Sequence, residues 1–62
     1  MDMHRAEQVM NNARAMPGGM AELLNNAQFC AGYWADEDEQ NPHHDATDDY
    51  FWWELGRRCV EA

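Results

Sequence analysis

The chain has 62 residues, of which 45% are apolar, and twelve acidic residues face four arginines and no lysine, giving a formal net charge of −8 at pH 7. A chain this short forms one domain and has little material for the concave pocket and supporting side chains of an active site. The charge also disfavours direct binding to nucleic acid, because surfaces that hold phosphate backbones depend on Lys and Arg. We therefore expect a single domain over residues 1–62 that is not an enzyme and needs no cofactor.

The location of the protein follows from features that are missing from the sequence. The first residues, 1–5, lack the apolar core of a secretory signal, and no stretch approaches the ~20 apolar residues of a membrane-spanning helix. Cys30 and Cys59 fit free thiols in a reducing compartment, and a single bridge between them remains an open alternative. These features predict a cytoplasmic protein that does not insert into membranes.

The first predicted helix covers residues 3–16. Six residues follow the three-and-four spacing of one helix face: Met3, Ala6, Val9, Met10, Ala13 and Met16. The sequence 17–19, Pro-Gly-Gly, ends this helix, because proline cannot continue a helix and glycine accepts the turn.

A second helix is predicted over residues 20–35. Met20, Leu23, Leu24, Ala27, Cys30, Ala31 and Trp34 make a wide apolar face on it. Phe29 and Tyr33 lie on another side, so this helix either touches two neighbours or exposes an aromatic pair. Gly32 costs about 1 kcal/mol in a helix interior relative to alanine, and a close helix contact would explain it.

The acidic residues gather between the second and third predicted helices. Residues 36–49 contain seven acids and no arginine. A run of charges is usually a solvated loop, and the alternative is a contact surface for a basic partner.

The third predicted helix covers residues 47–61. Asp45 or Thr47 can cap its start, where Asp48 and Asp49 suit the positive end of the helix dipole. Phe51, Leu55 and Cys59 form one stripe, Trp52 joins it, and Tyr50, Trp53 and Val60 form a second stripe. The predicted fold is therefore all-α, a small domain of three helices whose surplus aromatic residues face a partner or a second copy.

The cysteine, histidine and threonine residues are the candidates for a metal site and for nucleophilic catalysis. Cys30, His43, His44 and Cys59 could make a two-Cys, two-His zinc site, but the cysteines stand alone and the histidines are adjacent. The competing interpretation is two buried apolar cysteines and two histidines in an exposed turn. Serine is absent and Thr47 is the only threonine, so nucleophilic catalysis has few candidates.

One pattern in the second half of the chain resembles a known family. Ala31-Gly32, then Asn41-Pro42-His43, then Trp52-Trp53-Glu54-Leu55-Gly56 are similar to elements of the ribosome modulation factor family and its short bacterial and phage relatives. The resemblance covers residues 27–62. It implies a helix–loop–helix pair in which Gly32 and Gly56 allow close approach and Pro42 shapes the connection. The family's best-known member is basic and silences the ribosome, whereas this chain is acidic, and His43 replaces the usual aromatic residue.

Three functions remain open from the sequence. The first is a phage-type inhibitor, of the anti-CRISPR or anti-restriction class, that occupies a basic nucleic-acid-binding surface of a host protein. The second is a ribosome-associated, translation-silencing factor that contacts basic ribosomal proteins, and the third is the Cys/His metal module. A homodimer through the surplus aromatics is an additional possibility. For the first function the predicted contact charges are Asp36, Glu37, Asp38, Glu39, Asp45, Asp48 and Asp49, and the predicted apolar anchors are Phe29, Tyr33, Trp52 and Trp53.

Overall fold

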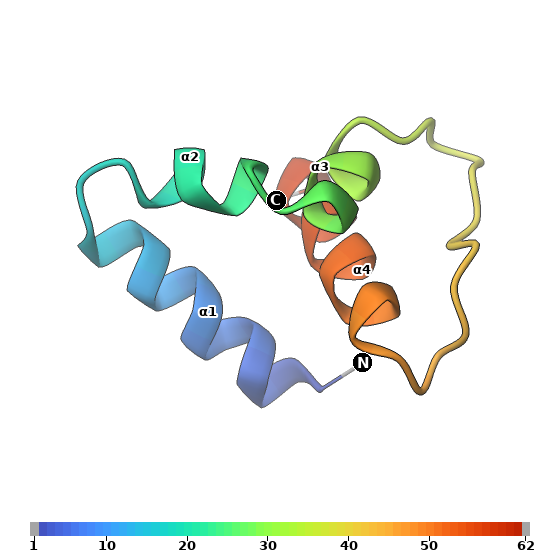
Figure 1. Cartoon of the computed structure of the whole chain (residues 1–62), viewed down its shortest axis with the longest axis horizontal. Helices are drawn as coiled ribbons and strands as arrows, with labels where there is room; N and C mark the ends of the chain where they lie inside the picture. The colour runs from blue at the N-terminus through green and yellow to red at the C-terminus, as the bar shows by residue number, and fades with distance from the viewer. Residues whose placement is uncertain (1, 62) are drawn as a thin grey trace.

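A computed structural model describes residues 2–61 of the chain. These residues form four helices: α1 (Met3–Ala15), α2 (Gly19–Leu24), α3 (Ala27–Tyr33) and α4 (Asp48–Glu61). Figure 1 shows α1 and α2 as the two arms of a V, with α3 lying across α4 and a long loop joining these two. The predicted all-α class is confirmed.

The helix predicted over residues 20–35 is interrupted, and this part of the prediction is wrong. Asn25 and Asn26 separate α2 from α3, and the backbone of Asn26 is extended, with φ −74° and ψ 121°. The Asn26 side chain accepts hydrogen bonds from the backbone N–H groups of Gln28 and Phe29 at 3.0 and 3.1 Å. Asparagine competes with helical hydrogen bonding in this way, so a second helix starts where one long helix was expected.

The ends of the other two helices follow from caps that the sequence supplies. The Asp2 side chain accepts from the backbone N–H groups of His4 and Arg5 at 3.1 and 3.2 Å, and α1 ends one residue before the predicted Met16. Gly18 has φ +74°, which permits the tight turn into α2. Thr47 caps α4, because its Oγ1 accepts from the N–H of Tyr50 at 3.2 Å.

Two glycines let α3 and α4 pack backbone to backbone. A Cβ atom at Gly32 would overlap the backbone carbonyl of Trp53, and one at Gly56 would overlap that of Phe29. The close contact predicted at Gly32 is therefore present, and it is reciprocal. Together with the connecting loop, these helices make the helix–loop–helix pair that the family resemblance implies.

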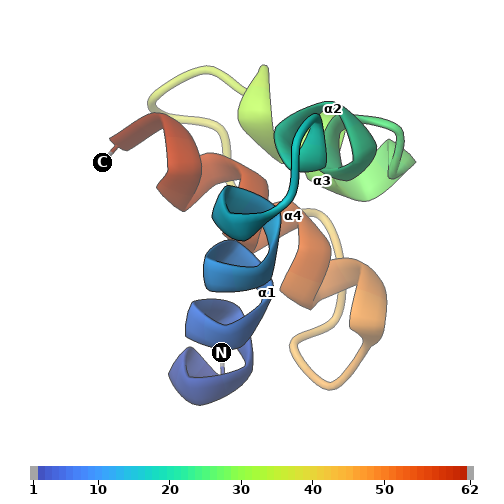
Figure 2. The ribbon, with the colours of Figure 1, turned by 90° about the vertical axis from the view of Figure 1, so that its left-hand side faces the viewer.

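The core lies where α1 meets the α3–α4 pair. Phe29 is fully buried, and the small Ala6 of α1 reaches Phe51 and Leu55 of α4 in the same cluster. Trp53 is 2% exposed. Figure 2, in which α1 faces the viewer, shows the α3–α4 loop running behind α4, on the side away from α1. Within residues 2–61, no helix is both long enough and apolar enough to cross a membrane.

Candidate protein-binding site

The acidic segment, residues 36–49, combines the α3–α4 loop with the first two residues of α4. Loops of this length without secondary structure are uncommon and are usually either functional or disordered. This loop is held at several points along its length. All seven acidic residues of the acidic segment are exposed to solvent: Asp36, Glu37, Asp38, Glu39, Asp45, Asp48 and Asp49.

Arg57 of α4 holds the start of the acidic segment. Its guanidinium donates to the backbone carbonyl of Asp36 at 2.7 Å and to that of Glu37. The same guanidinium lies 5.7 Å from the ring centroid of Trp53. Because the acceptors are carbonyl groups, the side-chain carboxylates of Asp36 and Glu37 stay available for other contacts.

Asn41 and His43 hold the middle of the segment. The Asn41 Nδ2 donates to the backbone carbonyl of Tyr50 at 3.1 Å and to a carboxylate oxygen of Glu54 at 3.2 Å. Its Oδ1 accepts from the N–H of His43 at 3.0 Å, and the ring Nε2 of His43 lies 2.6 Å from Oε1 of Gln28 on α3. These contacts fix the loop to both helices through amide, imidazole and backbone groups.

A turn at His44 leads the segment into α4. The Thr47 hydroxyl donates to the carbonyl of His44 at 2.7 Å, and the N–H of Ala46 donates to Nδ1 of His44 at 3.2 Å. The carboxylate of Asp45 lies 3.5 Å from the same Nδ1 atom, and the two form an ion pair only when the imidazole is protonated. The hydrogen bonds that make the turn use hydroxyl, imidazole and backbone groups.

One carboxylate of the segment has a cationic partner among the described residues. Asp48 accepts from Arg5 at 3.1 Å, in an exposed pair of the kind that contributes at most about 1 kcal/mol. The remaining carboxylates have no arginine partner within residues 2–61: Asp36, Glu37, Asp38, Glu39, Asp45 and Asp49.

The predicted aromatic anchors divide into core and surface residues. Phe29 is 0% and Trp53 2% exposed, so neither can meet a partner, and their assignment as contact residues is wrong. Their burial follows from the glycine contacts, because Gly32 and Gly56 bring the two helices close enough to enclose both rings. Tyr33 and Trp52 are partly buried, the latter against the edge of Phe51 at 5.3 Å between centroids.

Trp34 is an exposed aromatic residue that sequence analysis placed on the apolar helix face. It is 73% exposed and lies at the C-terminal cap of α3, with non-helical φ −95° and ψ 3°. Tyr33 supports it in an edge-on contact, with ring centroids 5.0 Å apart. Only one residue separates Trp34 from Asp36. The sequence signal for its exposure was the place of this tryptophan at the end of the helical spacing, close to the start of the acidic run.

The four candidate zinc ligands do not form one site. Within residues 2–61, no three His, Cys, Asp or Glu residues are arranged to hold a metal ion. Cys30 and Cys59 are free, partly buried thiols. His43 is bonded to Gln28, and His44 belongs to the exposed turn before α4.

No protein-family model, curated protein or solved structure matches this chain. Its function has to be argued from the site alone. The site is an ordered, strongly acidic loop with one exposed tryptophan beside it.

Proposed function

We propose that the chain is a binding protein whose acidic segment occupies a basic, nucleic-acid-binding surface of a target protein. The bound chain would act as an inhibitor of the phage-type anti-CRISPR or anti-restriction class. Its negative charge and its volume would both keep nucleic acid away from that surface of the target. One observation carries the proposal. The acidic segment is fastened to α3 and α4 through backbone, amide and imidazole groups, while six of its seven carboxylates have no arginine partner among the described residues.

Preorganisation gives this arrangement its value for binding. Ordering a flexible acidic loop on association costs free energy, roughly 0.5–1.5 kcal/mol for each immobilised side chain. Arg57 and Asn41 have already fixed the backbone, so less ordering remains for the moment of binding. The concentrated negative charge also attracts a basic surface at a distance and accelerates encounter.

Trp34 replaces the two buried residues as the apolar anchor of this surface. Tryptophan is enriched among residues that carry interface energy, and a cation over its ring gains further stabilisation. A basic target offers such cations in its Lys and Arg side chains. The proposed contact set is therefore Trp34 with the seven acids of the segment, supported by Tyr33.

The experiment compares two variants that each raise the net charge by two. The tagged wild-type chain and the D38N/E39Q variant are used to capture proteins from bacterial lysate, and bound proteins are eluted by rising salt. We expect a basic nucleic-acid-handling protein that the wild type retains to higher salt than the variant does. Short duplex DNA added in excess should release it, because both ligands would use one surface.

The matched control is E22R, which changes the net charge by the same amount at one exposed residue outside the acidic segment. This control should keep the target to nearly the wild-type salt concentration. Equal losses in the two variants would show that total charge, and not the acidic segment, governs binding. Retention of the target in the presence of excess DNA would contradict the shared surface.

A ribosome-associated, translation-silencing function is the second candidate, favoured by the close α3–α4 pair at Gly32 and Gly56. The acidic segment would then meet basic ribosomal proteins. Sedimentation of lysate with added chain distinguishes the two candidates: co-migration with ribosomal subunits supports this one, and its absence supports the first. Both functions place the protein in the cytoplasm, consistent with the free Cys30 and Cys59.

A further inference from the structure

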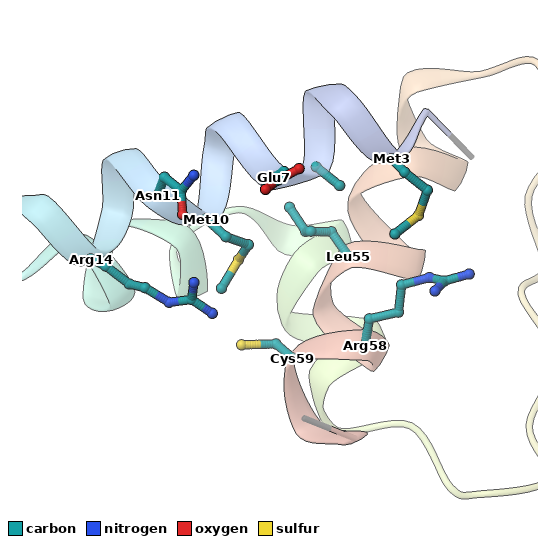
Figure 3. Close-up of a pocket in the computed structure, with 9 residues that line it drawn as sticks. Met3, Glu7, Met10, Asn11, Arg14, Leu55, Arg58 and Cys59 are labelled. Carbon is teal, nitrogen blue, oxygen red and sulfur yellow. The ribbon is translucent and has the colours of Figure 1, made fainter.

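A second surface lies on the opposite side of α4 from the α3–α4 loop. A groove of about 310 Å³ runs between α1 and α4, as Figure 3 shows. Met10, Leu55 and Cys59 give it an apolar lining, and Met3 stands at one end with 55% of its surface exposed. Flexible, polarizable methionine side chains suit a surface that another helix covers. The groove is wide enough for side chains of a packing helix and has no covering element in residues 2–61.

The charged residues of this groove have no ion-pair partners among the described residues. Glu7 and Arg14 line the groove from α1, and Arg58 lines it from α4; all three are exposed. Glu7 and Arg14 share one face of α1 but lie seven residues apart, which at 1.5 Å per residue is roughly 10 Å along the axis. Glu7 and Arg14 therefore cannot satisfy each other within one α1.

We propose that a second copy of this chain occupies the groove, with the two α1 helices antiparallel across a two-fold axis near Met10. In that arrangement Glu7 of one copy lies opposite Arg14 of the other, and the two-fold axis makes the pair occur twice. Met10 meets its own equivalent near the axis. Met3 and Cys59 then lose their contact with solvent at the edges of the joint.

The net charge of −8 does not prevent this association, because the charge is unevenly distributed. Residues 1–34 carry only the acids Asp2, Glu7 and Glu22 against the arginines Arg5 and Arg14. The α3–α4 loop lies behind α4 when α1 faces the viewer (Figure 2), so a joint through α1 keeps the loop acids of the two copies apart, and Asp48, which does reach α1, is paired with Arg5. Repulsion over such separations is largely screened at physiological salt, where the Debye length is about 8 Å.

A second copy would also add burial that a chain of this size needs. Domains below about 70–80 residues rarely obtain enough stability from a single core and often add oligomerisation. Here α1 contributes little to the core beyond Ala6 and Ala13, and its remaining apolar side chains stay partly or largely exposed. The proposal is independent of the function of the acidic segment.

The test is the association state of the full chain by sedimentation equilibrium, from micromolar to millimolar concentration. We expect a reversible dimer for the wild type. R14E makes both reciprocal pairs repulsive and should weaken association by about tenfold or more. E7R/R14E restores attraction with reversed polarity and should return the dissociation constant to within about threefold of the wild type.

Net charge is controlled by a second double variant. R14E/E22R has the same net charge as the wild type and as E7R/R14E, but Glu22 lies outside the groove. It should remain as weakly associated as R14E. Far-UV circular dichroism checks that each variant keeps its helices. The NMR signals of the methionine methyl groups should shift with protein concentration in the wild type and in E7R/R14E, but not in R14E or R14E/E22R. A wild type that is monomeric at millimolar concentration, or equal association of the two double variants, would overturn the proposal and leave the groove to another occupant, such as an acidic amphipathic helix.

Discussion

Replacing Gly32 by alanine tests the contact that holds the α3–α4 pair together. The new Cβ would overlap the backbone carbonyl of Trp53, and backbone atoms cannot move aside as a flexible side chain can. The two helices must separate, and the fully buried Phe29 and the nearly buried Trp53 then lose packing. Overpacking of this kind typically costs 1–3 kcal/mol and occasionally more.

The helix propensity of alanine acts in the opposite direction. Alanine is favoured over glycine by about 1 kcal/mol in a helix interior, and this gain is available at position 32. Because the overlap is with backbone, we expect a steric cost at or above the upper end of the usual range and a net loss of roughly 2 kcal/mol in the free energy of unfolding. At about 0.05–0.15 kcal/mol per residue, a domain of this length holds only roughly 3–9 kcal/mol in total.

The assay is urea denaturation followed by tryptophan fluorescence and by far-UV circular dichroism. Gly18→Ala is the matched control, since nothing lies within 4 Å of a Cβ there and only its φ of +74° opposes the change. That strain costs roughly 1–2 kcal/mol, without altering the helix pair. A Gly32→Ala variant as stable as the wild type, or more stable, would refute the argument, because the propensity term would then exceed the steric one.

Three further predictions use single side chains. Phe29→Ala should reduce the free energy of unfolding by about 3–5 kcal/mol, because Phe29 is fully buried. Trp34→Ala should change it by less than about 0.5 kcal/mol, because Trp34 is 73% exposed. Equal effects of the two substitutions in chemical denaturation would contradict the assignment of Phe29 to the core and Trp34 to the surface. Asp2→Ala should cost about 1 kcal/mol through loss of the α1 cap, seen as faster amide exchange at the start of α1, and unchanged exchange would show that the cap is dispensable. Asn41→Ala removes the bonds to Tyr50 and Glu54 and should accelerate amide exchange in the acidic segment while α4 stays protected; loss of protection in both would mean that the loop supports the helix.

The presence and approximate ends of the first and last helices could be predicted from the sequence, because turn and capping residues mark where they end and begin. The Pro-Gly-Gly turn and Thr47 place the end of α1 and the start of α4 within one residue of their predicted positions. The break at Asn25-Asn26 was missed because the apolar spacing continues across it, and periodicity alone does not reveal a side chain that caps a new helix.

The candidate site was predictable in its charges and less so in its aromatics. The seven acids of the acidic segment are exposed because burying a charge is costly, so their exposure could be predicted from the sequence alone. Which aromatic rings are buried depends on how closely α3 approaches α4, a tertiary property set by Gly32 and Gly56. Trp34 leaves the core because the helix ends there, and its backbone departs from helical angles.

The division between fold and charge suggests how the acidic segment can vary without loss of structure. The core is made by apolar residues of α1, α3 and α4, and the segment is fastened by Arg57, Asn41 and His43. Its own carboxylates contribute one exposed pair to Arg5 and otherwise repel one another. Neutralising Asp38 and Glu39 should therefore leave the free energy of unfolding unchanged or slightly raised, since self-repulsion falls and no contact is lost. The carboxylates of Asp38 and Glu39 form no ion pair among the described residues, an arrangement that fits the proposed role of the acidic segment in binding a basic target.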